Sequence, residues 1–314
     1  MPERIRVLII GLGVQGRKRL AVAGADVIGT VDPVVPEARY RRLEEVPLTS
    51  YDAALVCTPD QAKVELLRHL LAHGKHALVE KPLTASDADQ LRELEGLARA
   101  SGAVCYTAYN HRFEPHLVRL KALLDAGTLG SVYLGRFFYG NGTVRDVRES
   151  PWRDQGGGVL TDLGSHLLDL ARFLFGDAVA SEGFRAWSLK RFENRAWDHV
   201  LFGMGGPPTL VMEATLVAWR NTFTAEVFGE RGSAHVHGLC KWGPSTFTVR
   251  RRVLPSGRPE EQTETLAGSD PTWTAEYEHF QRLCQTGRTD LRNDLWINAM
   301  LNELARSPGE MAVA

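Results

Sequence analysis

Apolar and polar positions alternate in a regular way along the first third of the chain. Short runs of β-branched and other apolar residues predict buried strands. The first, third and fourth runs are each followed by a stretch whose apolar residues recur at three- and four-residue steps, as in a helix. The predicted strands span residues 5–10, 27–32, 53–57, 75–79 and 104–108, and the predicted helices span 17–23, 61–73 and 85–101. Repeated strand–helix units indicate a parallel sheet with helices on both faces, whose ligands bind beyond the carboxyl ends of the strands.

The pattern changes after a predicted helix at residues 115–126. From there, strands separated by turn signals predominate, which indicates a mainly antiparallel sheet. The predicted strands span residues 132–139, 182–189, 199–204, 209–216, 222–228, 234–239 and 245–253, and helices at 275–284 and 294–306 close the chain. One face of such a sheet needs cover, and the opposite face often becomes a subunit contact. We therefore expect a homo-oligomer.

A helix inside the second half carries a candidate pair for proton chemistry. It follows the three glycines at 156–158, and its apolar stripe consists of Leu160, Leu163, Leu167, Leu170 and Leu174. Asp162 and His166 lie four residues apart, so they share one face of the helix beside this stripe. A carboxylate that orients an imidazole raises its basicity and suits it to general-base catalysis. The alternative is a local hydrogen-bonded pair without a chemical role.

Composition and charge narrow the class of protein. The chain has 314 residues, of which 44% are hydrophobic and 24% charged, which is typical of a soluble globular protein with two domains. The net charge of −1 gives no overall attraction to nucleic acid or to an anionic membrane. The apolar run near the start is too short for a signal or membrane segment. The four cysteines are widely spaced without a CxxC motif, which favours a reducing, cytoplasmic compartment.

A glycine motif stands between the first predicted strand and the first helix, where a Rossmann fold binds a dinucleotide. In such a turn the first glycine permits the bend, the second lets the backbone approach the pyrophosphate, and the third lets the helix pack on the strand. The expected cofactor contacts here are Gly11, Gly13, Val14, Gln15 and Gly16. A glycine turn in an unrelated α/β unit is the alternative.

Asp32 bears on the choice of cofactor. It ends the second predicted strand, 21 residues after Gly11, where a carboxylate binds the ribose hydroxyls of NAD and repels the 2′-phosphate of NADP. The basic residues that follow, Arg39, Arg41 and Arg42, could hold a phosphate but more readily form a solvated face. We therefore predict NAD rather than NADP.

Further polar residues follow the next three predicted strands. The residues expected at this edge of the sheet are Thr58, Pro59, Glu80, Lys81 and Asn110. Lys81 follows a buried strand directly and is fixed by the next residue, a proline. An ammonium in that place stabilises the alkoxide that develops during oxidation of an alcohol. The alternative is a surface lysine paired with Glu80.

A metal site is not expected. His235 and His237 share one face of a predicted strand, but no third ligand is evident from the sequence. A solvated or interface face of the strand accounts for these histidines more simply.

These motifs together resemble the glucose–fructose oxidoreductase, inositol dehydrogenase and rhizopine-catabolism (Gfo/Idh/MocA) family, and the resemblance covers nearly the whole chain. The segments that carry it are the glycine motif, Thr58–Pro59, 74–82, 110–113 and 152–169. The resemblance implies an α/β fold with an N-terminal Rossmann domain, here residues 1–117. An α+β domain with a large open-faced, mainly antiparallel sheet follows, here residues 118–314. One departure is that Asp60 and Lys63 stand where members often carry Asn-x-x-His after Thr-Pro.

The resemblance also implies an activity. Members mostly oxidise or reduce sugars, sugar acids, nucleotide sugars and cyclitols, often as dimers or tetramers. The family's catalytic lysine, aspartate and histidine fall on Lys81, Asp162 and His166. We therefore expect an NAD-dependent dehydrogenase that forms a homodimer or homotetramer through the C-terminal sheet. Candidate contacts to the sugar-like substrate are Arg112, Trp152, Arg153 and Asp169. Two alternatives stay open: an NAD-dependent glycosidase that oxidises the sugar transiently, and a non-catalytic cofactor or sugar sensor.

Overall fold

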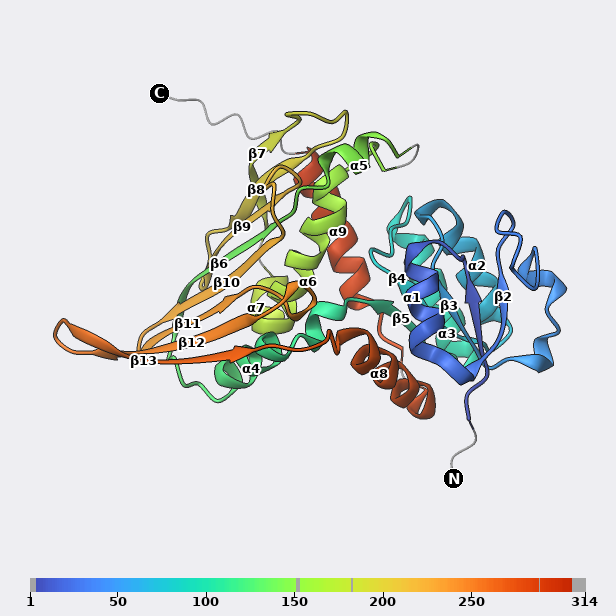
Figure 1. Ribbon diagram of the computed structural model, residues 1–314, viewed down its shortest axis with the longest axis horizontal. Coiled ribbons are helices and arrows are strands. Elements are labelled where there is room, and N and C mark those ends of the chain that lie inside the picture. Colours follow the sequence, from blue (N-terminus) through green and yellow to red (C-terminus); the bar gives the residue numbers. More distant parts are fainter. Residues whose placement is uncertain (1–3, 151–152, 182, 288, 307–314) are drawn as a thin grey trace. The chain divides into compact units, whose positions relative to one another are not determined.

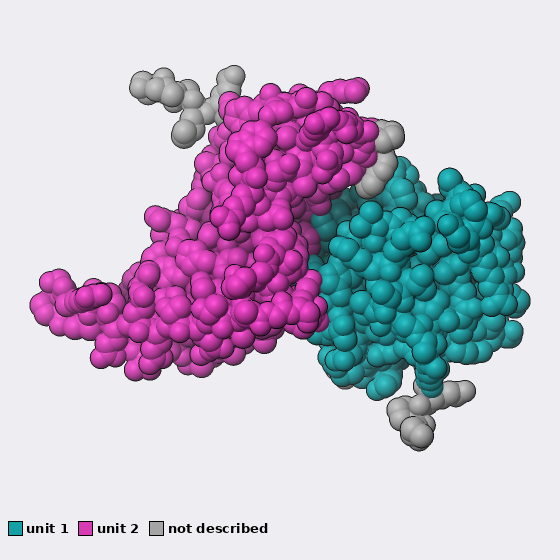
Figure 2. Space-filling model, viewed as in Figure 1, with its two compact units in different colours: residues 1–110, 273–298 teal, residues 111–272, 299–314 magenta. Residues whose placement is uncertain are grey.

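Two compact units make up the protein (Figure 2). The structure, a computed structural model, describes residues 4–150, 153–181, 183–287 and 289–306. The first unit runs to Asn110 and also includes residues 273–298, and the second unit holds residues 111–272 and those from Ala299 onward. The division thus falls earlier than the expected boundary at residue 117, and a segment near the C-terminus returns to the first unit.

The returning segment belongs to the first unit because its apolar side chains complete that unit's core. Helix α8 (Thr272–Thr286) buries Tyr277 and Phe280 against the same hydrophobic cluster as Val7 and Ile9 of the first strand. The rule that neighbouring elements pack together does not foresee a helix that arrives from more than 250 residues away.

The first unit is built on a sheet of five parallel strands, sheet A, in the order β2-β1-β3-β4-β5. The strands are β1 (Val7–Ile10), β2 (Val27–Val31), β3 (Ala53–Val56), β4 (His76–Glu80) and β5 (Cys105–Ala108). The helices are α1 (Val14–Ala23), α2 (Asp60–Ala72), α3 (Ala88–Ser101) and α8, together with the first part of α9 (Arg292–Arg306). The predicted parallel Rossmann-like sheet is confirmed.

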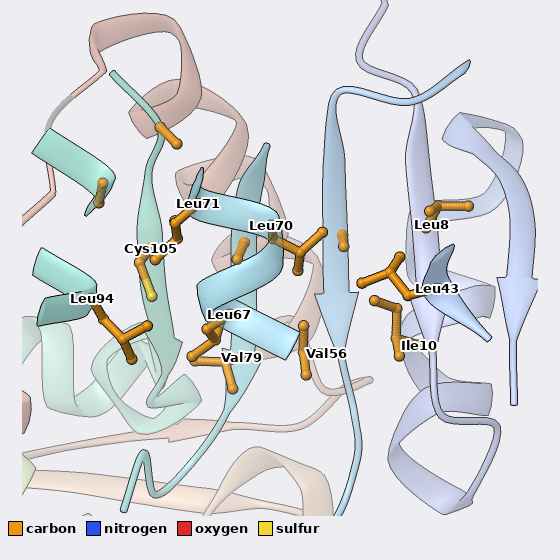
Figure 3. Packing of buried hydrophobic residues seen from close by; sticks show 14 of the residues in the cluster. Leu8, Ile10, Leu43, Val56, Leu67, Leu70, Leu71, Val79, Leu94 and Cys105 are labelled. Atoms are coloured by element: carbon orange, nitrogen blue, oxygen red, sulfur yellow. The ribbon is translucent and has the colours of Figure 1, made fainter. Parts of the chain in front are cut away.

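Alternate residues of each strand fill two cores, one on each face of sheet A. On one face, Leu8, Val56 and Val79 pack against leucines of α2 and α3 (Figure 3). On the other, Val7 and Leu55 pack near α1 and α8. The alternation follows from the period of two in a strand, and burial on both faces explains why these strands are apolar throughout.

The second unit holds a sheet of eight strands, sheet B, in the order β13-β12-β11-β10-β6-β9-β8-β7. Among the described strands of sheet B only β6 and β9 pair in parallel, so the predicted mainly antiparallel sheet is confirmed. The strands are β6 (Val132–Gly140), β7 (Arg185–Lys190), β8 (His199–Met204), β9 (Thr209–Thr215), β10 (Thr222–Gly229), β11 (Gly232–His237), β12 (Ser245–Val253) and β13 (Gly257–Leu266).

Helices cover one face of sheet B (Figure 1). They are α4 (Pro115–Asp125), the π-helical turn η5 (Leu160–Gly164) and α6 (Ser165–Phe175). Two shorter helices lie next to η5 and α6 in the sequence: α5 (Val144–Arg148) precedes η5, and α7 (Asp177–Ala180) follows α6. In α6 the leucine stripe is buried, as predicted. Among the described helices of both units, none is long and apolar enough to cross a membrane.

The strand β13 is absent from the predicted elements. Its residues are exposed on both faces up to Leu266, so no apolar alternation marks it. Pairing with β12 holds it in place, through an ion pair between Arg250 and Glu261 at 2.6 Å and a hydroxyl contact between Thr248 and Thr263 at 2.9 Å. Cross-strand pairs of this kind stabilise a hairpin that hydrophobic pattern alone does not predict.

A half-buried histidine, His76, makes the fold sensitive to acid. Burial lowers the pKa of His76, and the Nδ1 atom of its ring accepts the Val104 N–H at 2.9 Å, which requires an unprotonated nitrogen. The unfolded chain therefore binds a proton more readily, so stability is present above about pH 6.5 and is lost as the pH falls through the lower, folded-state value. Thermal melts between pH 8 and pH 5 are expected to show a falling Tm. The dependence should be weaker in His76→Gln and unchanged in the exposed control His73→Gln.

Candidate active site

The turn between β1 and α1 has the shape that a pyrophosphate requires. Gly11 has a φ of +91°, and a Cβ there would lie 2.6 Å from the Cys57 carbonyl oxygen. A Cβ on Gly16 would lie 1.8 Å from the Gly11 oxygen, whereas a Cβ on Gly13 would meet nothing within 4 Å. Packing therefore requires glycine at two of the positions, and the third leaves open space at the start of α1.

The start of α1 provides donors for an anion. The residue before the helix, Gly13, has no side chain to cap it, so the first-turn amides keep the polarity of a helix N-terminus. Val14 is 74% exposed at this end, as expected of a residue that faces a ligand rather than the core. The predicted motif fits the phosphates of a dinucleotide.

Asp32 is fixed at the end of β2 by three backbone amides. Its carboxylate accepts the Leu12 N–H at 2.7 Å and the N–H groups of Val34 and Val35, both at 2.9 Å. Burial by itself raises the pKa of Asp32, but the three backbone hydrogen bonds outweigh it and lower the pKa. A carboxylate has about four acceptor sites, so one remains for a ribose hydroxyl.

The three arginines after Asp32 are exposed, as expected of a solvated face, and they bond to groups of the chain itself. The Arg41 guanidinium donates to the Val35 carbonyl at 2.7 Å, and that of Arg39 donates to the Ile28 carbonyl at 2.9 Å. Arg42 pairs with Glu44 at 3.6 Å. Arg41 thus closes the loop that seats Asp32.

The remaining cofactor candidates of the first unit follow strands β3, β4 and β5 as predicted. Thr58 comes two residues after β3, Glu80 ends β4 and Asn110 comes two residues after β5. The Thr58 hydroxyl is buried and has no hydrogen-bond partner in the described part of the chain. Because buried hydroxyls are normally paired, this one fits a ligand that brings a partner.

Glu80 is part of a buried ion network. The Arg19 side chain is 1% exposed and contacts Glu80 at 2.7 Å and Glu276 of α8 at 2.6 Å. Burial alone lowers the pKa of Arg19, but the carboxylates of Glu276 and Glu80 outweigh it and raise the pKa. The network ties α1 and α8 to the residue directly before Lys81.

The helix that carries His166 begins with a wider turn than predicted. The α-helical pattern holds from Ser165, but residues 160–164 form the π-helical turn η5. Successive residues in such a turn are separated by less rotation than in an α-helix, and that Asp162 and His166 share one face stays a prediction. π-turns are rare and occur often at functional sites.

His166 is buried in the second unit and stacks on another histidine. Its ring lies 4.1 Å from the His111 ring at an angle of 20°, and Tyr139 lies 5.8 Å away. His166 is 6% exposed and His111 3%. Two imidazolium ions at this distance repel by about 4 kcal/mol at an effective dielectric constant of 20. A positive charge on one ring therefore disfavours a positive charge on the other.

Asp162 forms an ion pair with an arginine of the same unit. It pairs with Arg153 at 3.7 Å, and its side chain is 41% exposed. This contact joins two residues that the sequence places in the site, one as catalytic and one as a substrate contact. Trp152 lies outside the described residues. That Asp162 orients His166 stays a prediction.

The other two substrate candidates pair with each other. Arg112 donates to both carboxylate oxygens of Asp169, at 2.5 to 3.1 Å. The Asp169 side chain is 2% exposed and that of Arg112 is 28%. Asp169 thus holds the Arg112 guanidinium, and contact of either residue with a substrate stays a prediction.

Lys241 is a candidate that sequence reasoning misses. It lies in the short helix η6 (Cys240–Trp242), and its ammonium donates to the Tyr139 hydroxyl at 3.1 Å and lies 4.8 Å from the Trp242 ring. Lys241 is exposed, and Tyr139 connects it to the His111–His166 stack. No motif marks a lone lysine in a loop. Only the fold brings it to the stack.

The histidines of β11 have a neighbour that the sequence did not suggest. Glu226, on the adjacent strand β10, lies with His235 and His237 in a cluster that has ligand atoms within 4.8 Å of one another. Both ring nitrogens of His235 are engaged, because Nδ1 faces Glu226 at 3.1 Å and Nε2 faces Ser233 at 2.8 Å and Arg250 at 3.1 Å. The positively charged Arg250 guanidinium beside His235 would repel a metal cation bound to this cluster.

Two family models match the chain. The model described as "Oxidoreductase family, NAD-binding Rossmann fold" matches residues 5–109, and the model described as "GFO/IDH/MocA C-terminal domain" matches residues 117–235.

Known proteins match nearly the full length. An uncharacterized oxidoreductase, YdgJ, of Escherichia coli (strain K12) is 30% identical over 88% of this chain and 88% of its own. A scyllo-inositol 2-dehydrogenase (NAD(+)) of Bacillus subtilis (strain 168) is 24% identical over 96% of this chain and 92% of its own. Among solved structures, levoglucosan dehydrogenase with NADH aligns with a TM-score of 0.83 at 18% identity over 98% of this chain and 97% of its own. That last likeness concerns the fold.

Proposed function

Because the chain belongs to the Gfo/Idh/MocA family of oxidoreductases, we propose that it transfers a hydride between NAD and a secondary alcohol or ketone of a sugar, nucleotide sugar or cyclitol. The observation that carries the proposal is the buried His111–His166 stack, in a chain whose other unit has a turn shaped for a dinucleotide. The scyllo-inositol 2-dehydrogenase supports the substrate class, since inositol is a hydroxyl-rich ring compound.

In the proposed mechanism Lys81 and His166 are the two polar groups that act on the reacting alcohol. Bound NAD supplies the nicotinamide carbon that accepts the hydride. His166 takes the hydroxyl proton, and Asp162 supports the positive charge that the imidazole gains. Lys81 donates a hydrogen bond to the same oxygen and stabilises the negative charge that develops there. The alcohol thus loses one hydride from carbon and one proton from oxygen as its carbonyl forms.

Asp32 supports NAD over NADP in this proposal. Its carboxylate is held ionised by the three backbone amides, and a 2′-phosphate beside it would meet a fixed negative charge. The nearby Arg39 and Arg41 donate to backbone carbonyls of the chain. They would have to break these bonds to hold a phosphate.

A substrate panel tests the proposed function. Purified protein is incubated with NAD or NADP and with sugars, sugar acids, nucleotide sugars or inositols, and NADH formation is followed by absorbance. We expect turnover with at least one ring polyol and a preference for NAD. Cleavage of chromogenic glycosides without net NADH would instead identify a glycosidase. Tight binding of NAD and sugar without either reaction would identify a sensor.

We also propose that the chain forms a homodimer or homotetramer through sheet B. The face opposite α6 carries the half-buried apolar residues Phe138, Leu201 and Val211. Light scattering at micromolar concentration checks this, and the mass of a single chain would contradict it.

A further inference from the structure

Lys63 of α2 is a buried cation that contacts the residue next to Lys81. It is 2% exposed, although lysine is almost never fully buried unless it is paired. Its ammonium donates to the Pro82 carbonyl at 2.8 Å and forms an ion pair with Asp60 at 2.7 Å. Lys63 therefore holds the residue that directly follows Lys81.

Burial of the charged Lys63 ammonium is energetically unfavourable by itself. Burial lowers the pKa of Lys63, even though Asp60 and Glu80 act in the opposite direction, and Lys81 adds to the lowering. The partner Asp60 is partly exposed, with 43% of its side chain accessible, so the pair is only half shielded from water. Removing one member of a buried ion pair destabilises a protein, but the intact pair adds little net stability compared with apolar residues of similar volume. Positioning is a better reason for its presence.

A second buried cation holds the other side of Lys81. Arg19 of α1 contacts Glu80 at 2.7 Å, and Glu80 directly precedes Lys81. The next carbonyl beyond Pro82, that of Leu83, accepts a hydrogen bond from Asn298 at 2.6 Å. Each residue beside Lys81 is thus fixed by a side chain from a different helix.

We propose that Lys63, paired with Asp60, is a positioning residue that fixes the Pro82 carbonyl and thereby aims the Lys81 ammonium at the reacting oxygen. The inference rests on the proposed function, in which Lys81 stabilises that oxygen. It also gives a reason for the sequence departure, because Asp60 and Lys63 replace the Asn-x-x-His pattern as a pair. A lysine is long enough to reach the carbonyl, and the aspartate neutralises its charge.

Kinetics of three variants test the proposal. Lys63→Met removes both contacts while keeping a long apolar chain, and we expect kcat to fall about 10- to 100-fold with little change in the dissociation constant for NAD. Lys63→Arg keeps a cationic donor and should recover most of the loss. The control is Lys75→Met, since Lys75 also donates to a backbone carbonyl of this unit, that of Tyr51, at 2.9 Å. It should leave kcat unchanged.

A second measurement separates this proposal from the proposed function. The rate at which acetic anhydride labels Lys81 is measured by peptide mass spectrometry, and it needs no substrate. We expect Lys63→Met to change the labelling of Lys81 at least about threefold relative to exposed Lys18, and Lys75→Met to leave it unchanged. Unchanged labelling and kcat in Lys63→Met, with only a lower Tm, would overturn the positioning role. Altered labelling in a protein that oxidises no substrate would overturn the proposed function alone.

Discussion

Replacing His166 with alanine is expected to lower kcat by about 10²- to 10⁴-fold, the range in which a general base contributes. The hydroxyl proton then has no basic acceptor as the hydride leaves. The dissociation constant for NAD should change by less than about twofold, because the residues that fit the cofactor belong to the other unit. Steady-state kinetics on the substrate found by the panel, together with NAD titration by fluorescence, measure the two effects.

His116 supplies the matched control for this variant. It is also a buried histidine of the second unit, 1% exposed, with its Nε2 3.2 Å from the Ser245 carbonyl and its ring 5.8 Å from Phe247. His116→Ala should lower Tm and leave the kcat of the folded protein intact. Added imidazole should restore part of the activity of His166→Ala only. Equal losses in both variants would indicate a packing effect, and undiminished turnover in His166→Ala would remove it from the role of base.

The elements that the sequence predicts well are those with a local signal. Residues 53–56 are buried on both faces and bounded by turns, so their apolar run marks a strand without any tertiary information. Strand β13 lacks such a signal because it is polar on both faces, and the cross-strand pairs that hold it are visible only in the folded hairpin. The sequence does not predict that α8 packs in the first unit for a related reason: its amphipathic pattern does not say which sheet it covers.

The residues of the candidate site also divide into those with a local signal in the sequence and those without one. The glycine turn and His166 stand in local motifs, and the resemblance to a family gives them roles. Arg17 and Arg19 are nearly identical in local pattern, yet only Arg19 is buried, and its partner Glu276 is 257 residues away. The departure at Lys63 is visible in the sequence, but its contact with Pro82 depends on the packing of α2 against the end of β4.

Replacing Arg19 with methionine is expected to destabilise the protein by about 3–5 kcal/mol, the range for breaking a buried ion pair by removing one partner. The variant leaves the Glu276 carboxylate, 0% exposed, and the Glu80 carboxylate without their shared cation. The same change also removes the packing of the guanidinium against the Trp273 ring, 4.3 Å away. Calorimetry should show a fall in Tm of about 10 °C or more.

Two further variants decide whether the loss comes from the carboxylates that have lost their contact with Arg19. Arg68 of α2 is also an arginine paired with two glutamates, Glu65 and Glu93, but at the surface, so Arg68→Met should leave Tm almost unchanged. Adding Glu276→Met to Arg19→Met removes the fully buried charge and should recover part of the stability, since an apolar pair of similar volume can replace a buried ion pair. If the double variant is no more stable than Arg19→Met, the loss comes from packing around Trp273 rather than from the broken ion pair with Glu276. Partial recovery would leave Glu80 as the remaining unpaired group, next to the lysine on which the proposed chemistry depends.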